Sequence, residues 1–281
     1  MTELQLGITM IASDQSMNVI ELATACEERG FSSLWYPEHT HIPVSRETPP
    51  PTGDAELPIE YTRTLDPLVA IAAGAAVTDS LRFGTGILLP AQREPIVTAK
   101  AIATIDHLAP GRFDLGIGFG WNVDEMRNHG VNVPTRRAQV RDHVSAMRAL
   151  WSPEPTPVSS EHVHITPSWA FPKPASGTPR VFIGGAPGPK LLDAVADYAD
   201  GWLPIGGQGI KDAIPALEQA CERYGRDYRS LVIIPFGTLP NPGKLEYYAS
   251  LGITEVVLRV SSGPREVVLP ELDAHAAYLV R

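Results

Sequence analysis

The feature that most constrains the fold of this 281-residue chain is a regular alternation of strand-like and helix-like segments. Eight runs carry the branched and aromatic residues typical of strands, at 4–11, 33–37, 81–89, 113–119, 180–185, 201–205, 231–236 and 255–260. Apolar residues recur at helical spacing between them, as in 19–26, 140–147, 192–199 and 272–279. This alternation predicts an α/β fold with a parallel sheet, and the count of eight favours a closed (β/α)8 TIM barrel over an open doubly wound sheet.

The length fits one barrel domain covering residues 1–281. Two connections, 42–66 and 152–179, are too long to be turns, but the alternation resumes after each, so we interpret both as loop insertions. The first follows the second strand and therefore lies at the C-terminal face of a barrel, where active sites are built. We expect it to act as a lid.

Composition excludes several classes of partner. The formal net charge of −9 opposes binding to a phosphate backbone, so nucleic acid is not expected. The longest small or apolar run, 68–77, is too short to span a membrane, and the N-terminus lacks a signal-like pattern, so a cytoplasmic location is expected. Cys26 and Cys221 fall on apolar helix stripes, which predicts buried free thiols.

The stretch WYPEHTHI places Glu38, His39 and His41 directly after the second strand. A histidine in the mouth of a barrel is suited to proton transfer near neutral pH, although a simple loop hydrogen bond is an equal alternative. His39 and His41 also form a His-x-His pair. Because the first, fifth, sixth and eighth strands end without further ligands, no metal is expected.

Glycines gather at the ends of later strands. GTG at 84–86 indicates tight packing or a ligand close to the backbone, and GIGFG at 116–120 leaves one face bare for a flat ring or a helix. GGAPGPK at 184–190 opens a helix, which favours an anion site, and GGQG at 206–209 repeats the pattern.

Three runs together resemble a known family: GFSSLWYPEHTHIPV, LRFGTGILLPAQREPIVTAKAIATIDHLAPGRFDLGIGFGWNVDEM and PRVFIGGAPGPKLLDAVADYADGWLPI. They are similar to the luciferase-like monooxygenase superfamily, and most similar to its branch that uses the deazaflavin coenzyme F420. The resemblance covers nearly the whole chain. It implies a barrel that holds a flavin-like ring at its C-terminal face, with F420 as cofactor and FMN as the alternative.

The resemblance also assigns residues. It implies that His39 lies near the reactive carbon, that Glu38 reaches the ring, and that a non-prolyl cis peptide between Gly86 and Ile87 supports the ring from behind. The expected cofactor-binding residues are Gly86, Ile87, Gly118, Phe119, Asn122, Gly184, Gly185, Gly188, Gly206 and Gly207.

The sequence departs from the sugar-phosphate dehydrogenases of the superfamily at two positions. Trp121 stands where they carry a glutamate, and Gln208 lies near the place of their lysine, so glucose 6-phosphate is a poor guess for the substrate. Asn122 and Glu125 become the local polar candidates.

The predicted function is hydride transfer between F420 and a small organic substrate, with His39 as general acid or base. An FMN-dependent monooxygenase that uses O2 and a non-catalytic flavin-binding protein are the alternatives. Pairing of the outer helices into a homodimer is left open.

Overall fold

The computed structural model describes residues 4–50, 53 and 56–279. Within them one parallel sheet has the strand order β10-β11-β1-β2-β3-β4-β7-β8-β9. Its strands are β1 (Gln5–Thr9), β2 (Ser33–Tyr36), β3 (Arg82–Thr85), β4 (Phe113–Ile117), β7 (Arg180–Gly184), β8 (Gly201–Leu203), β9 (Val232–Ile233), β10 (Phe236–Thr238) and β11 (Glu255–Arg259). Seven of the eight predicted strands are therefore confirmed with shorter bounds, and the predicted strand 231–236 corresponds to β9 and β10.

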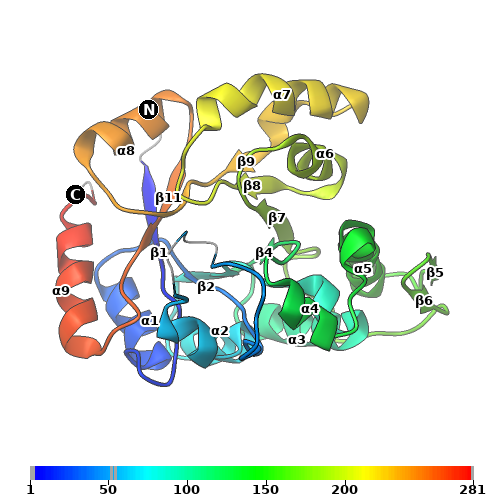
Figure 1. Cartoon of the computed structure of the whole chain (residues 1–281), viewed down its shortest axis with the longest axis horizontal. Coiled ribbons are helices and arrows are strands. Elements are labelled where there is room, and N and C mark those ends of the chain that lie inside the picture. The colour runs from blue at the N-terminus through cyan, green and yellow to red at the C-terminus, as the bar shows by residue number, and fades with distance from the viewer. Residues whose placement is uncertain (1–3, 51–52, 54–55, 280–281) are drawn as a thin grey trace.

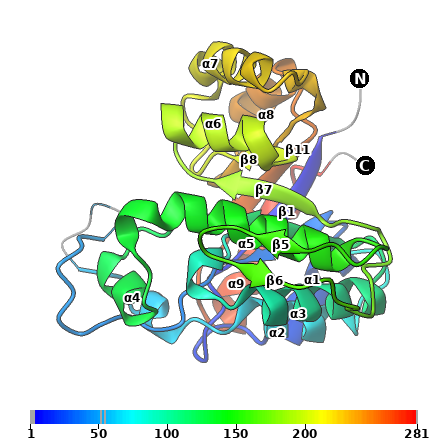
Figure 2. The ribbon, with the colours of Figure 1, turned by 90° about the vertical axis from the view of Figure 1, so that its right-hand side faces the viewer.

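Helices follow the strands and lie around the outside of the sheet (Figures 1 and 2). They are α1 (Val19–Glu28), α2 (Pro67–Ala75), α3 (Pro95–Leu108), α4 (Val123–Asn128), α5 (Arg136–Trp151), α6 (Pro189–Tyr198), α7 (Ile210–Arg223), α8 (Pro242–Ser250) and α9 (Arg265–Ala276). Short 3-10 turns are η1 (Ile59–Arg63), η2 (Pro90–Gln92), η3 (Val133–Thr135) and η4 (Tyr228–Ser230). Within the described residues no helix has the length and apolar character that crossing a membrane requires.

The predicted seventh strand is divided in two. Pro235 has no backbone N–H to give to a ladder, and it separates β9 from β10. These two short strands form the opposite edges of the sheet, yet only Ile234 and Pro235 stand between them. Ile234 N donates to Trp202 O at 3.0 Å and Val257 N donates to Pro235 O at 2.9 Å. The sheet therefore curls until both of its edges belong to one stretch of chain.

Aromatic and aliphatic side chains fill the inside of the curl. The buried cluster is Trp35, Phe182, Leu203, Ile234, Phe236 and Val257. Trp35 packs edge-on against Phe182 and Phe236, with ring centroids 6.1 and 5.7 Å apart. A Cβ on Gly84 would lie 2.2 Å from the Trp35 ring, so this glycine of the third strand is there for packing. A larger buried cluster lies between the sheet and its helices, so apolar side chains pack on both faces of the curled sheet.

The second long connection carries a small antiparallel pair, β5 (Val158–Ser159) and β6 (His164–Ile165), which lies beside α5 (Figure 2). This connection also contains the one cis peptide bond of the described residues, Phe171–Pro172. The expected cis bond between Gly86 and Ile87 is therefore wrong. With a trans backbone there, Gly86 N donates to Tyr36 O at 2.7 Å and Leu88 N donates to Gly116 O at 2.8 Å, so the ladder continues past the end of β3 on both sides.

Candidate active site

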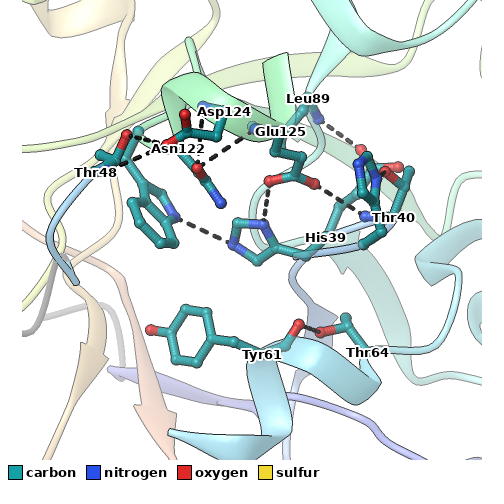
Figure 3. Close-up of polar contacts among 12 residues, drawn as sticks. His39, Thr40, Thr48, Tyr61, Thr64, Leu89, Asn122, Asp124 and Glu125 are labelled. Atoms are coloured by element: carbon teal, nitrogen blue, oxygen red, sulfur yellow. Dashed lines mark hydrogen bonds and ion pairs between the residues drawn. The ribbon is translucent and has the colours of Figure 1, made fainter. Parts of the chain in front are cut away.

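His39 and Glu125 form a buried pair at the C-terminal ends of β2 and β4 (Figure 3). His39 Nδ1 lies 2.7 Å from Glu125 Oε2, and the two side chains are 9% and 0% exposed. On its other side, the indole nitrogen of Trp121 donates to His39 Nε2 at 3.1 Å. Because an indole N–H can only donate, Nε2 accepts, and the imidazole proton is assigned to Nδ1 facing the carboxylate.

Glu125 owes its place to the start of α4. The Asn122 side chain caps this helix by accepting from the amides of Asp124 and Glu125 at 3.2 and 3.4 Å. The cap places Glu125 at the third helical position, and its second oxygen accepts from Thr40 N at 3.1 Å. One carboxylate thus ties the loop after β2 to the helix after β4. Asn122 Nδ2 is buried and has no hydrogen-bond partner among the residues that the structure describes.

The predicted lid, 42–66, is attached to the same helix. Thr48 donates to Asp124 Oδ2 from both N and Oγ1, at 3.2 and 3.1 Å. Hydrogen bonds from the backbone of Thr48 and Glu47 hold the pKa of Asp124 below its usual range, although burial opposes this. Residues 51–52 and 54–55 of the lid lie outside the described residues, and closure of the lid stays a prediction.

The lid brings an aromatic ring to the pair. Tyr61, in η1, faces His39 with ring centroids 5.5 Å apart, and the Tyr61 and Trp121 rings are 6.2 Å apart (Figure 3). Arg63 anchors this turn through an ion pair with Asp14. His39 therefore lies between aromatic surfaces from two different loops.

Glu38, expected to reach the cofactor ring, is committed to the protein. It is 3% exposed; one oxygen accepts from Leu89 N at 2.7 Å and the other pairs with Arg93. Burial raises the pKa of Glu38 in spite of Arg93. These bonds hold the segment that follows β3 in position, which is the role of Glu38 in this structure. Its expected contact with the cofactor ring stays a prediction.

The glycine face of the fourth strand is not left bare for a ring. Thr85 O lies 2.0 Å from the Cβ position of Gly116, and Met126 of α4 lies 3.0 Å from that of Gly120, so a helix takes part of the face as one alternative predicted, while Ile87 covers Gly118. A Cβ on Gly118 would lie 2.7 Å from Ile87 Cγ2, and one on Gly184 would lie 2.3 Å from Ile87 Cδ1. Gly86 is filled from the other side, with Phe236 Cζ 2.4 Å from its Cβ position. The missing side chains of these glycines leave room for Ile87 and Phe236, and Ile87 is half-buried.

The next residue of the fourth strand's glycine run, Phe119, is 8% exposed. The Arg137 guanidinium lies over its ring, 4.0 Å from the centroid, and Arg136 Nε donates to its carbonyl at 3.0 Å. Burial and the neighbouring Arg136 lower the pKa of Arg137. The contacts with Phe119 therefore hold positively charged side chains near the start of α6, where Arg137 also donates to the Lys190 carbonyl at 3.4 Å.

The N-termini of α6 and α7, which follow β7 and β8, lie close together and have no side-chain caps. Gly188 precedes α6 and Gly209 precedes α7, and neither start receives a side-chain cap. The Cβ position of Gly209 lies 3.5 Å from Pro187, so the two loops adjoin, and the Cβ position of Gly188 meets only open space. Amides of a helix's first turn favour an anion. In α6 this leaves Lys190 N, because Pro189 has no N–H and Leu191 N donates to Gly188 O at 2.9 Å.

The other glycines of these loops use their amides within the protein. Gly185 N donates to Leu203 O at 3.1 Å, Gly206 N to Phe236 O at 2.8 Å, and Gly207 N to Pro204 O at 3.0 Å. Their cofactor-binding role stays a prediction, and it cannot use these amides in this arrangement. If an anion binds at 184–190 and 206–209 as expected, the amides that remain for it are those at the starts of α6 and α7.

Sequence reasoning named Glu125 only as a local polar candidate and missed Thr40 and Tyr61. The run NVDE at 122–125 carries a usable signal, since Asn followed three residues later by Glu is the pattern of a capped helix start. The pairing of Glu125 with His39 joins residues 86 positions apart, which no local pattern reveals.

Comparison with known proteins agrees with this architecture. An uncharacterized protein of Mycobacterium tuberculosis is 41% identical over 254 residues, covering 89% of this chain and 90% of that protein. An F420-dependent glucose-6-phosphate dehydrogenase of Kineococcus radiotolerans is 31% identical over 222 residues, covering 73% of this chain and 58% of its own length. In fold, a monooxygenase from Streptomyces bottropensis superposes with a TM-score of 0.77 at 18% identity, covering 98% of both chains.

The family model for luciferase-like monooxygenases matches residues 7–239. That span runs from β1 to just beyond β10 and contains every residue of the site described above. The chain belongs to the luciferase-like monooxygenase family.

Proposed function

We propose that this protein is an F420-dependent oxidoreductase that transfers a hydride between the deazaflavin and a small organic substrate. The observation that carries the proposal is the buried His39–Glu125 pair at the mouth of the curled sheet, which we take to be the full (β/α)8 barrel of the family. The F420-dependent relative from Kineococcus supports the choice of cofactor.

His39 supplies the proton chemistry of this reaction. When a substrate hydroxyl is oxidised to a carbonyl, a hydride leaves its carbon and a proton leaves its oxygen. Nε2 of His39 takes that proton, because Glu125 holds the other ring proton on Nδ1 and compensates the charge of the imidazolium. In the reverse direction the same nitrogen returns the proton. Trp121 occupies Nε2 through its N–H, so the substrate oxygen takes that place when it binds.

The residues present fit a phosphate-bearing cofactor. The uncapped starts of α6 and α7 and the open space at Gly188 would hold its charged chain. The unpartnered amide of Asn122 is a buried donor beside the pair. When bound, F420 supplies a carbon centre that accepts or donates the hydride. Ile87 and Tyr61 exclude water around the reacting atoms.

Aromatic surfaces set the kind of substrate. Trp121 replaces an acidic side chain that the sugar-phosphate enzymes use, and together with Tyr61 it makes the surroundings of His39 apolar. Such a site favours a small substrate with one hydroxyl or carbonyl over a sugar phosphate, since a buried polyol would leave polar groups unpaired.

An FMN-dependent monooxygenase is the second candidate. The structural neighbour from Streptomyces is described as a monooxygenase, and an uncapped phosphate site serves FMN as well as F420. A non-catalytic flavin-binding protein would have no need for a buried carboxylate held against an imidazole, which is costly to bury.

Titration of the purified apoprotein with F420 and, separately, with FMN tests the proposal, with binding followed by cofactor fluorescence. Tight F420 binding, weak FMN binding and reduction of bound F420 by small alcohols support it. Preference for FMN with oxygen consumption overturns it in favour of the second candidate. The His39→Ala variant should bind the cofactor with unchanged affinity and lose turnover; full turnover would remove His39 from the mechanism.

A charge substitution tests the anion site. Gly188→Asp puts a favoured capping residue at the start of α6, so the fold should be as stable as the wild type or slightly more stable. The added negative charge should weaken binding of a phosphate-bearing cofactor by about tenfold or more. Gly188→Asn has the same shape without the charge and should weaken binding much less. Equal affinity of the two variants would place the cofactor chain elsewhere.

A further inference from the structure

A second group of potential ligands lies behind the His39–Glu125 pair. His41, Glu125 and His129 each offer a ligand atom, and these atoms all lie within 4.8 Å of one another. Glu125 and His129 are four residues apart, so they share one face of α4 and its C-cap, while His41 comes from the loop after β2. The ring centroids of His41 and His129 lie 5.4 Å apart.

The two imidazoles converge on one hydroxyl. Thr40 Oγ1 lies 2.6 Å from His129 Nε2 and 3.0 Å from His41 Nδ1. A hydroxyl has one proton to donate, so it can serve only one of these nitrogens as donor, and the other imidazole must turn its own N–H toward the oxygen. Asn128 Nδ2 lies 2.9 Å from the far nitrogen of His41 and fixes that ring from behind. Two imidazole nitrogens therefore lie close together around the Thr40 hydroxyl, and a bound ion would take the place of that hydroxyl at both.

The charge of Glu125 favours a cation beside these two imidazole nitrogens. The Glu125 side chain is fully buried, and its one ion pair among the described residues is with His39. Its other partner, Thr40 N, is a neutral donor. A buried carboxylate without a permanent cation costs free energy, and a divalent ion held by the same carboxylate would offset that cost.

The donor set selects the class of ion. Two imidazole nitrogens and one carboxylate oxygen are the ligands of three-residue zinc sites, which keep a water in the fourth position, whereas Mg²⁺ and Ca²⁺ prefer oxygen ligands. Metal–nitrogen bonds of about 2.0–2.1 Å would require these atoms to approach to roughly 3.4 Å of one another. His41 is half-buried and His129 is exposed, so their side chains have room for that movement.

We propose that His41, Glu125 and His129 bind a divalent transition-metal ion of the zinc class. The ligand count at strand ends, which predicted no metal, took no account of His129 because it follows its strand by a full loop and helix. The site shares Glu125 with the His39 pair but requires no bound cofactor, and its test reads Zn²⁺ binding, so its failure can be told apart from a failure of the proposed function.

The test uses the full-length protein, stripped with a chelator and titrated with Zn²⁺ against a chromophoric competitor. We expect one equivalent to bind, and Co²⁺ to give the intense visible absorption of a four-coordinate site. His41→Ala and His129→Ala should each weaken Zn²⁺ binding by about tenfold or more, and Mg²⁺ should not compete.

Matched variants separate a real site from general histidine binding. His162 is not part of this cluster, and its Nδ1 lies 2.7 Å from Asp142 Oδ2. His162→Ala should therefore leave Zn²⁺ affinity unchanged. Thr40→Val removes the hydroxyl that competes for both nitrogens, and it should preserve or strengthen binding. Absence of stoichiometric binding, or equal affinity in wild type, His41→Ala and His129→Ala, would overturn the proposal.

Discussion

At the scale of single residues, the central relation is a carboxylate that orients an imidazole. Glu125 Oε2 accepts from His39 Nδ1 and so leaves Nε2 as an acceptor, which the Trp121 N–H occupies. In the proposed function a substrate oxygen replaces that N–H. Loss of the carboxylate should therefore lower the rate of turnover much more than loss of the indole N–H.

We expect Glu125→Gln to lower kcat by about 10²–10⁴-fold, because glutamine neither fixes the ring proton nor compensates the imidazolium. Trp121→Phe keeps an aromatic ring and removes only the N–H, so its kcat should stay within about tenfold of wild type. Single-turnover rates of cofactor reduction at saturating cofactor measure both. A larger loss in Trp121→Phe than in Glu125→Gln would contradict this division of roles.

The same residues show how far sequence reasoning reaches. His39 could be singled out because its type and its place after a strand both point to proton transfer. Glu38 is adjacent in sequence and has the right chemistry, yet its oxygens are taken by Leu89 N and Arg93. Which of two carboxylates faces an imidazole depends on tertiary packing, and no spacing along the chain encodes it.

At the scale of elements, α4 is a short helix whose start controls the site. Asn122→Ala removes its cap and should lower the free energy of unfolding by about 1 kcal/mol. Asn122→Ser keeps a capping oxygen and loses the amide nitrogen, so stability should return close to wild type. If Asn122 Nδ2 contacts the cofactor, Asn122→Ser will still bind it more weakly. Urea unfolding and fluorescence titration give the two readouts separately.

A surface carboxylate joins α1 to the start of β3 and should make stability depend on pH. Glu27 accepts from the amides of Ser80 and Leu81 at 2.7 and 2.9 Å. Burial acts to raise the pKa of Glu27, but these hydrogen bonds outweigh it and lower the pKa overall. Its stabilisation is therefore present above the ordinary carboxyl pKa of about 4.3 and is lost as the pH falls through the lower folded value.

Glu27→Gln should be less stable than wild type by about 1 kcal/mol at neutral pH, and the difference should shrink as the solution is acidified below pH ~4. The exposed neighbour Glu28 provides the control, since Glu28→Gln should track the wild type throughout. Denaturant unfolding across the pH range measures both. A constant difference between Glu27→Gln and wild type would show that the ionised carboxylate is not the cause.

Element positions were predictable because periodicity and turn residues are local properties. Gly30, for example, follows α1 in left-handed backbone, the conformation for which glycine is favoured at a helix end. The division of the seventh strand could be read from Pro235, since a proline interrupts a strand's hydrogen-bond ladder. The covering of Gly118 by Ile87 was not predictable, because it depends on which strands become neighbours when the sheet curls.

At the scale of the whole molecule, the question is whether this curled sheet unfolds as one unit. Its edges, β9 and β10, come from one stretch of chain, so opening either edge disturbs strands on both sides. The sequence predicted a single domain covering residues 1–281, and two buried thiols placed on different helices can test it. Cys26 lies in α1 and Cys221 in α7, and both are 0% exposed. Burial raises the pKa of both thiols, which leaves little reactive thiolate.

We expect neither thiol to react with a thiol reagent in the native protein. In increasing urea, Cys26 and Cys221 should become reactive at the same concentration, because cooperative unfolding exposes α1 and α7 together. The single-cysteine variants Cys221→Ala and Cys26→Ala assign each signal, and the circular dichroism midpoint of each variant corrects for its own loss of stability. If one thiol reacts well before its variant's circular dichroism midpoint, that side of the sheet opens first and the molecule has two units of stability, whatever its topology.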